Sequence, residues 1–450
     1  MAKNMTEGNP LKLILTFSLP LLAGNLVQQT YNMVDAAIVG RMLGASALGA
    51  VGVSTSVQFM VLGFCIGICT GFAVPVAQAF GAGDQKHMRR IIWHGAVLAV
   101  LIGALLTLFC ALFTGQILHL LKTPADIFED AYRYLLVIFL GIPCTLLYNF
   151  LAGILRAVGD SRTPFFFLAF SAALNIILDL LCILVFRWDC AGAAIATVTA
   201  QGISGILCLL LIYRKFRNLI PVKNERRISW RMLGYIFGVG APMGLQFSIT
   251  AIGSMMMQTA NNGLGSTYVS AFTAAAKLKQ FTMGPFDAIA TACATFAGQN
   301  YGAGKPERIK QGIRMGVAAG VLYGLAAGII LAFFGRKISL LFVAGSESAI
   351  LDAAARYLKM LGIFFWLLGI LNVLRLAVQG LGYSGRAIFS GVSEMIARAL
   401  MSLFAVPVFG YAAICVTDQT AWIAAVAYII PTYLYVMKKV REKIVMGDRE

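Results

Sequence analysis

Long apolar runs alternate with short polar stretches along the whole chain. A helix that crosses a membrane needs about 20 predominantly apolar residues, and these runs reach or exceed that length. The pattern therefore predicts an all-α polytopic membrane protein rather than a soluble domain. We expect twelve transmembrane helices, at residues 11–39, 47–77, 90–114, 131–153, 163–186, 192–213, 232–259, 266–297, 311–334, 354–380, 387–409 and 411–437.

The composition agrees with this prediction. Apolar residues make up 59% of the 450 residues and charged residues only 12%, whereas soluble domains carry about 25% charged residues. The nine cysteines lie mainly within apolar runs and the three histidines are scattered, so we expect no disulfide and no cysteine–histidine metal centre. There is no Walker-type phosphate loop and no grouping of residues for acyl transfer. We therefore expect a protein that is not an enzyme and needs no organic cofactor.

The net charge of +17 is distributed unevenly among the loops. If the N-terminus lies inside the cell, the inside loops and tails carry more than three times as many lysines and arginines as the outside loops. The positive-inside rule then predicts a multi-pass protein of the plasma or inner membrane with both termini in the cytoplasm. This bias explains the basic composition, so no nucleic-acid partner is expected.

The second half of the chain repeats motifs of the first half, always 221 to 223 residues later. The repeats indicate a duplicated unit, which predicts an N-terminal six-helix lobe (1–217), a cytoplasmic linker (218–231) and a C-terminal six-helix lobe (232–450). An even number of spans gives both lobes the same orientation, and two such lobes can open a cleft to each side of the membrane in turn. The recurring pairs are Pro20/Pro242, Leu43-Gly44/Leu264-Gly265, Phe80–Gly83/Tyr301–Gly304, Arg133–Leu135/Arg356–Leu358, Asn149/Asn372 and Gly159/Gly382.

Two acidic residues of the first half fall within predicted spans. A charge at the centre of the bilayer costs about 2.5–3.5 kcal/mol on insertion scales, so such residues are candidates for function. Asp35 ends a polar stripe on one helical face, with Asn25, Gln28 and Asn32 before it and Tyr31 beside it. Asp179 follows Asn175 by one helical turn.

The depth of these residues suggests one shared site. At a rise of about 1.5 Å per residue, Asp35, Asp179 and Thr197 all lie in the outer half of the membrane. Carboxylate, amide and hydroxyl oxygens would suit Na⁺, whereas two neighbouring carboxylates could instead share a proton and carry it. A purely structural role, in which the two acids only satisfy hydrogen bonds, is the remaining alternative.

Other candidates are less specific. Pro20 should kink the first helix and could act as a hinge or as a static bend. Lys277 lies about eleven residues into its helix and could serve the substrate or a structural ion pair. Glu394 and Arg398 are four residues apart and should pair. In the second half, Met257 occupies the position that corresponds to Asp35 in the first half.

Taken together, these motifs resemble the multidrug and toxic compound extrusion (MATE) family over nearly the whole chain. The resemblance rests on Pro20, Tyr31–Asp35, the repeated Gly-Ala-Gly loops at 81–83 and 302–304, Arg156–Ser161, Asn175–Asp179 and Gly192–Thr197. It implies twelve helices in two like-oriented lobes and an antiporter that expels organic, often cationic and amphipathic, compounds in exchange for Na⁺ or H⁺. The family's cation site would then fall on Asp35, Asn175, Asp179 and Thr197, as a Na⁺ site if the protein is sodium-coupled, with Pro20 as the bending point.

One departure favours a particular subgroup. NorM-like members carry acids on helices 7 and 10, which this chain lacks, so it resembles the DinF-like or related bacterial members more closely. The leading hypothesis is a monomeric, secondary active multidrug exporter that contacts membrane lipids and binds small organic substrates near Gln28, Tyr31, Asn32 and Lys277. The alternatives are a flippase for a lipid-linked saccharide, for which Arg375 and Arg398 are the only deep arginines, and a membrane module that transports nothing.

Overall fold

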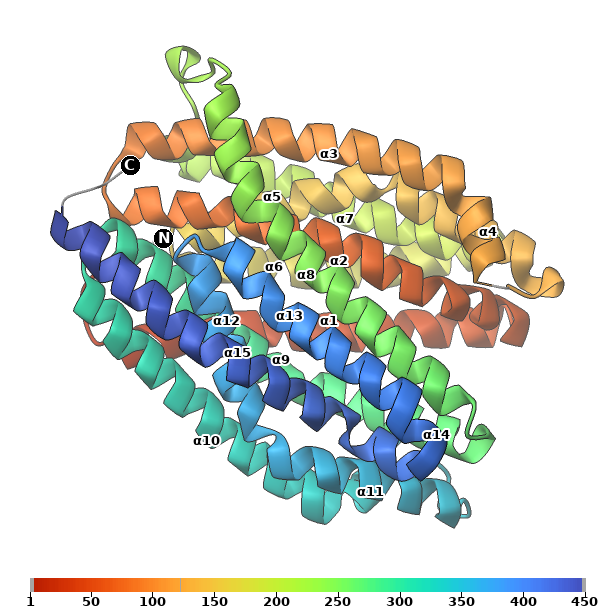
Figure 1. The fold of residues 1–450 in the computed structure, drawn as a ribbon. Coiled ribbons are helices and arrows are strands. Elements are labelled where there is room, and N and C mark those ends of the chain that lie inside the picture. The colour runs from red at the N-terminus through yellow and green to blue at the C-terminus, as the bar shows by residue number, and fades with distance from the viewer. Residues whose placement is uncertain (1–3, 122, 447–450) are drawn as a thin grey trace. The chain divides into compact units, whose positions relative to one another are not determined.

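The computed structural model describes residues 4–121 and 123–446, and in this part of the chain all regular structure is helical (Figure 1). Each predicted span coincides with one helix or with a helix that is interrupted once or twice. The first half contains α1 (Pro10–Met42), α2 (Ala45–Gly81), α3 (Gln85–Leu120), α4 (Ala125–Leu140), α5 (Ile142–Ala157), α6 (Arg162–Leu180), the π-helical turn η1 (Leu181–Val185) and α7 (Asp189–Lys215).

The second half repeats this order. It contains α8 (Trp230–Asn262), α9 (Ser266–Gly302), α10 (Pro306–Ser339), α11 (Ser348–Phe364), α12 (Trp366–Gly380), α13 (Ser384–Leu400), the π-helical turn η4 (Met401–Ala405), α14 (Val406–Phe409) and α15 (Tyr411–Met446). In each half, a π-helical turn follows the corresponding helix directly: η1 follows α6, and η4 follows α13. The all-α polytopic class predicted from the sequence is confirmed.

The number of apolar spans is nine among the described residues, or eleven if two bent pairs each count as one span. The bent pairs are α4–α5, which meet at 44°, and α11–α12, which meet at 57°. The helix that separates eleven from the predicted twelve is α9. It has 37 residues but carries Lys277, Lys279 and Asp287, which lower its apolarity.

The chain forms two compact units. The first comprises Ala23–Ser248 together with Asn4, and the second comprises Met5–Leu22 and Ile249–Glu450. Long helices therefore contribute to both units: α1 passes from the second to the first just after Pro20, and α8 passes from the first to the second after Ser248. The division of the sequence into lobes at residues 218–231 stays a prediction about the duplication.

The N-terminal segment is anchored within the second unit. Met5 is fully buried, and its backbone N–H donates to Gln299 Oε1 over 2.9 Å. Its carbonyl accepts from Asn300 Nδ2 and Arg308 Nη2, each at 3.2 Å. These residues flank the second Gly-Ala-Gly loop, so the two helix ends beside this loop hold Met5 in place.

The motifs that revealed the duplication are largely turns. In three of the pairs, both glycines have a positive φ: 90° and 104° at Gly44 and Gly265, 73° and 67° at Gly83 and Gly304, and 87° and 89° at Gly159 and Gly382. Residues with a Cβ rarely adopt such backbone angles. The repeated glycines therefore mark the same turns between helices in each half.

Glycines also set the packing of α10. They recur at every fourth position, and an added Cβ at Gly328 would lie 2.2 Å from the carbonyl oxygen of Gly362 on α11. A Cβ at Gly320 would lie 2.9 Å from Gly369 Cα on α12. Small residues at this spacing let two helix backbones touch. The full series is Gly312, Gly316, Gly320, Gly324 and Gly328.

The segment that joins the two halves packs against the beginning of α3. It contains two short 3₁₀ turns, η2 (Arg217–Leu219) and η3 (Lys223–Glu225). Glu225 is buried and accepts from Arg89 Nε and Nη2 at 2.7 and 2.6 Å. The hydrogen bonds from Arg89 lower the pKa of the Glu225 carboxyl to about 2. In addition, the backbone N–H of Ser229 donates to Nε2 of the buried His94 over 2.9 Å.

Candidate functional site

The structure brings the two predicted acids together. Asp35 lies in the second half of α1 and Asp179 near the end of α6, and their carboxyl groups are within hydrogen-bonding distance of each other. Asp179 is fully buried, whereas Asp35 is partly buried. Two carboxyl groups can form a hydrogen bond only if one of them holds a proton. A hydrogen bond between these two carboxyl groups therefore requires one shared proton.

Asn175 and Thr197 complete the predicted group. In the amide orientation that satisfies its hydrogen bonds, Asn175 donates from its nitrogen to Asp179 Oδ2 over 3.2 Å. Its oxygen accepts from the backbone N–H of Thr197 at 3.1 Å and from the Thr197 hydroxyl at 3.2 Å. Thr197 belongs to α7, so three helices of the first unit supply the oxygens. All four residues that the sequence grouped are thus adjacent.

The position of Asp179 has a local cause. It lies two residues before η1, where the α-helical hydrogen-bond pattern gives way to a π-helical turn. Such turns loosen the backbone and occur often at functional sites. The acid therefore sits where the end of α6 is interrupted rather than in the middle of a regular helix.

The acid pair has unused binding capacity. Oδ1 of Asp35 and Oδ1 of Asp179 are both buried and lack a hydrogen-bond partner. Within the described residues, no lysine or arginine pairs with either acid. Buried charges are normally paired, because desolvating a lone charge is costly. The two free oxygens, together with those of Asn175 and Thr197, form an oxygen-rich group of the kind that a proton or a small hard cation neutralises.

Two tyrosines border this site. Tyr31 lies one turn before Asp35 on α1 and is close enough to both acids to sense their charge. Tyr134 of α4 also lies near both acids, with Asp35 acting on it more strongly than Asp179, and it forms a hydrogen bond with Gln58 of α2. The sequence identified Tyr134 only as part of a repeated motif, and its recurrence was the one signal that could have marked it.

The other predicted substrate contacts do not form one cluster. Gln28 is half-buried and Asn32 is exposed, both on α1 with Tyr31. Lys277 lies in the second unit, where it lines a cavity of about 400 Å³ with Ser270, Thr273 and Phe342. Its ammonium group lies 5.7 Å from the centre of the Phe342 ring. Lys277 therefore faces the beginning of α11 and the turn before it.

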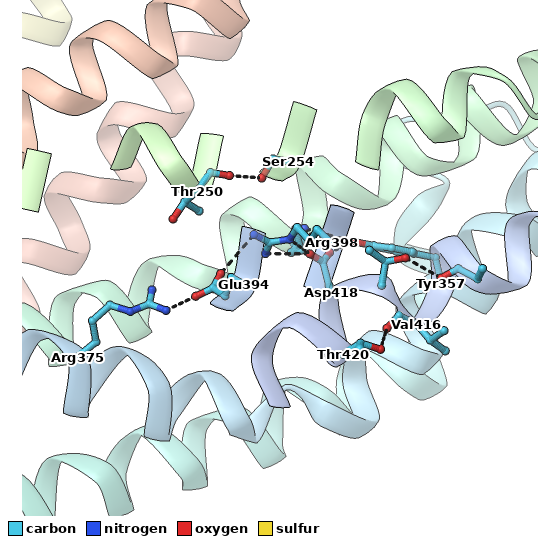
Figure 2. A network of polar contacts seen from close by, with 12 residues as sticks. Thr250, Ser254, Tyr357, Arg375, Glu394, Arg398, Val416, Asp418 and Thr420 are labelled. Carbon is cyan, nitrogen blue, oxygen red and sulfur yellow. Dashed lines mark hydrogen bonds and ion pairs between the residues drawn. The ribbon is translucent and has the colours of Figure 1, made fainter. Parts of the chain in front are cut away.

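The deep arginines of the second unit are engaged with acids. Arg375 pairs with Glu394 (Figure 2), and Arg398 lies 3.3 Å from Glu394 and 3.1 Å from Asp418. The predicted pairing of Glu394 with Arg398 is thus confirmed. A flippase for a lipid-linked saccharide would need free arginines to bind a pyrophosphate, and neither of these is free.

Comparison with known proteins agrees with the fold and with the duplication. The sequence model of the MatE family matches the chain twice, at residues 20–181 and 242–404. The chain belongs to this family, and it is a membrane transporter rather than an enzyme. The two matches begin 222 residues apart, in agreement with the spacing of the repeated motifs.

Individual relatives support the same conclusion. The chain is 34% identical over 383 residues to "Probable multidrug resistance protein YpnP" of Bacillus subtilis (strain 168), with 85% of each chain covered. It is 28% identical over 293 residues to "DNA damage-inducible protein F" of Escherichia coli (strain K12), covering 64% of this chain and 62% of that protein. A solved structure of a multidrug resistance MATE family transporter, described as outward-facing, matches with a TM-score of 0.89 at 21% identity over 97% of both chains.

Proposed function

We propose that this transporter is a secondary active multidrug exporter that exchanges Na⁺ or H⁺ for organic, often cationic and amphipathic, compounds. The observation that carries the proposal is the buried pair of Asp35 and Asp179, which has two free oxygens and no basic partner among the described residues. The 34% identical relative from Bacillus subtilis is also named as a probable multidrug resistance protein, which supports the multidrug part of the proposal.

The geometry suggests how one ion could be carried. When both carboxyls are ionised, two like charges lie together in a medium of low dielectric constant, which is unfavourable. A proton shared by the two carboxyls relieves this repulsion. Na⁺ relieves it too, held by Asp35, Asp179 and the oxygens of Asn175 and Thr197. Either ion would leave the pair with one net negative charge instead of two.

Exchange follows if the ion and the organic compound favour different states of the transporter. A ligand shifts a conformational equilibrium only by its difference in affinity for the two states. We propose that the ion binds from outside and favours the state that releases the compound, and that the ion then leaves to the cytoplasm. Pro20, near which α1 passes from one compact unit to the other, is the proposed hinge.

The compound itself would bind near the polar face of α1. Gln28, Tyr31 and Asn32 lie on this segment, and Tyr31 offers an aromatic ring to an organic cation. Lys277 is a second proposed contact, at the cavity of the second unit. We further propose that the protein works as a monomer in the plasma or inner membrane, surrounded by lipid, with both termini in the cytoplasm.

The test uses purified protein in liposomes loaded with a fluorescent organic cation. A Na⁺ gradient and a pH gradient are applied separately to the wild type, to Asp179→Asn and to Asp126→Asn, in which an exposed acid of α4 is changed as a control. We expect one of the gradients to drive the dye in the wild type and the control but not in Asp179→Asn. If Asp179→Asn transports the dye as the wild type does, the site assignment is wrong.

A further inference from the structure

A chain of ion pairs runs through the interior of the second unit, from Arg375 of α12 to Asp418 of α15 (Figure 2). Arg375 pairs with Glu394 of α13, and Glu394 also lies 3.3 Å from Arg398 one turn further along. Arg398 in turn contacts Asp418. All four side chains are buried, so these charges depend on one another rather than on solvent.

Asp418 is fully coordinated by groups of the chain itself. Its Oδ1 accepts from Arg398 Nε at 3.2 Å and lies 3.1 Å from Arg398 Nη2. Its Oδ2 accepts from Lys279 Nζ of α9 at 2.7 Å and from the Tyr357 hydroxyl of α11 at 2.6 Å. Each oxygen therefore has two donors, and neither has room for a diffusible cation. This is the opposite of the acid pair in the first unit.

The two arrangements occupy related places in the duplicated chain. Tyr134 and Tyr357 hold the same position in the repeated Arg-Tyr-Leu motif, and each lies near a buried acid. Tyr134 is hydrogen-bonded to Gln58 of α2, and Tyr357 accepts from Lys279 of α9 at 3.3 Å. Helices α2 and α9 both begin directly after the repeated Leu-Gly motif. In each half, the same helix thus presents a polar side chain to the same tyrosine.

The difference between the halves is one of charge. The first half presents the neutral Gln58 where the second presents the cationic Lys279. The second half also has the apolar Met257 where α1 carries Asp35. The two buried acids of the second unit are neutralised without a diffusible ion, because Glu394 and Asp418 pair with three basic side chains of the chain itself. These are Lys279, Arg375 and Arg398.

From this juxtaposition we infer that Lys279 is a tethered counter-cation, which permanently fills the second half's counterpart of the cation site. Only the first half then exchanges an ion, so one cation is bound per protein. This inference rests on the proposed function insofar as that function places the exchanged ion at Asp35 and Asp179. It predicts that the occupancy of each half is decided by a single position, Gln58 in one and Lys279 in the other.

The first experiment empties the second site. Binding of radioactive Na⁺ and uptake of protons are measured on purified full-length protein, starting from Asp179→Asn to silence the first half. We expect Lys279→Gln in that background to restore uptake of one cation per protein, and Asp418→Asn to remove it again. If the folded Asp179→Asn/Lys279→Gln protein takes up neither Na⁺ nor protons, the inference is wrong.

The second experiment fills the first site and does not depend on the folding of the Lys279 variant. Gln58 is half-buried, so Gln58→Lys introduces an ammonium group beside Tyr134 and the acid pair. We expect Gln58→Lys to abolish cation uptake, whereas Gln58→Met, which adds no charge, should retain it. Undiminished uptake in Gln58→Lys would overturn the inference.

The two proposals fail in different ways. If the wild type shows no cation uptake that depends on Asp179, the proposed ion exchange is wrong, yet the Lys279→Gln measurement still reports on Asp418. If the wild type instead loses a bound cation on Asp418→Asn alone, ion exchange at the first site can stand but the tethered-cation inference cannot.

Discussion

The glycine face of α10 gives a prediction about how closely its helices are packed. An alanine at Gly328 would place its Cβ 2.2 Å from the carbonyl oxygen of Gly362. Ordinary contacts between heavy atoms begin at about 3.5 Å, so α10 and α11 would have to separate by roughly 1 Å. Gly328→Ala therefore tests whether the backbones of α10 and α11 are in contact.

The change in the free energy of unfolding caused by Gly328→Ala is the sum of two opposing effects. Replacing glycine by alanine inside a helix gains about 1 kcal/mol of helix propensity. Forcing a methyl group into a fully packed site costs about 1–3 kcal/mol. At Gly234 of α8, an added Cβ would meet nothing within 4 Å, so only the gain applies there. Gly328→Ala should therefore be less stable than Gly234→Ala by about 1–3 kcal/mol.

The assay is reversible unfolding in mixed micelles of detergent and SDS, followed by tryptophan fluorescence. Gly362→Ala meets the same contact from the other side, at 2.3 Å from the carbonyl oxygen of Gly328. The double variant should therefore cost less than the sum of the single costs, because the first methyl group already separates the helices. If Gly328→Ala stabilises the protein as much as Gly234→Ala does, the reasoning about backbone contact is refuted.

Three further predictions concern charges and the hinge. Glu225→Gln should lower the thermal midpoint in detergent at pH 7, because the ion pair of Glu225 with Arg89 is lost. The pKa of Glu225 in the folded protein lies below its ordinary value of 4.5, so the stabilisation by this pair is complete above pH 4.5 and should vanish as the pH falls towards 2. Glu129→Gln, in an exposed pair, should change the midpoint little at any pH. Lys279→Met should cost up to about 3–5 kcal/mol in SDS unfolding, because it removes one of the two basic partners of the buried Asp418 and leaves only Arg398. Adding Asp418→Asn should recover part of that loss, and equal costs with and without Asp418→Asn would contradict the pairing. Pro20→Ala should slow ion-driven dye exchange in liposomes several-fold without reducing cation binding, and an unchanged rate would argue against a hinge there.

Much of the candidate site was predictable because it depends on helix geometry alone. The spacing of Asn175 and Asp179 puts them on one face, and the depth of Asp35 and Thr197 follows from where their helices begin. Since α-helices have a fixed rise and period, these positions could be compared across the first half without a structure. In the structure, Asn175 contacts Asp179 and Thr197, and the carboxyls of Asp35 and Asp179 are paired. The role of these four residues as a cation site stays a prediction.

The second half was harder to predict because its chemistry depends on pairing between distant helices. Lys277 and Lys279 are two residues apart, and both appear in the sequence as charges at similar depth. Only Lys279 faces the core, where it meets Asp418, 139 residues further along the chain. No local pattern identifies such a partner. The bends between α4 and α5 and between α11 and α12 were likewise missed, because each pair reads as one apolar run.

The central claim is that the acid pair carries one ion in exchange for the organic compound. The most direct test uses a gradient of the organic compound, instead of an ion gradient, as the driving force. Liposomes with the protein are given a gradient of the organic cation but no gradient of Na⁺ or pH, and the movement of Na⁺ and of protons is recorded. Coupling is reciprocal, so the compound should drive one of these ions in the opposite direction in the wild type, and not in Asp179→Asn. Movement of the compound with no opposing ion movement, or the same ion movement in Asp179→Asn, would contradict the account.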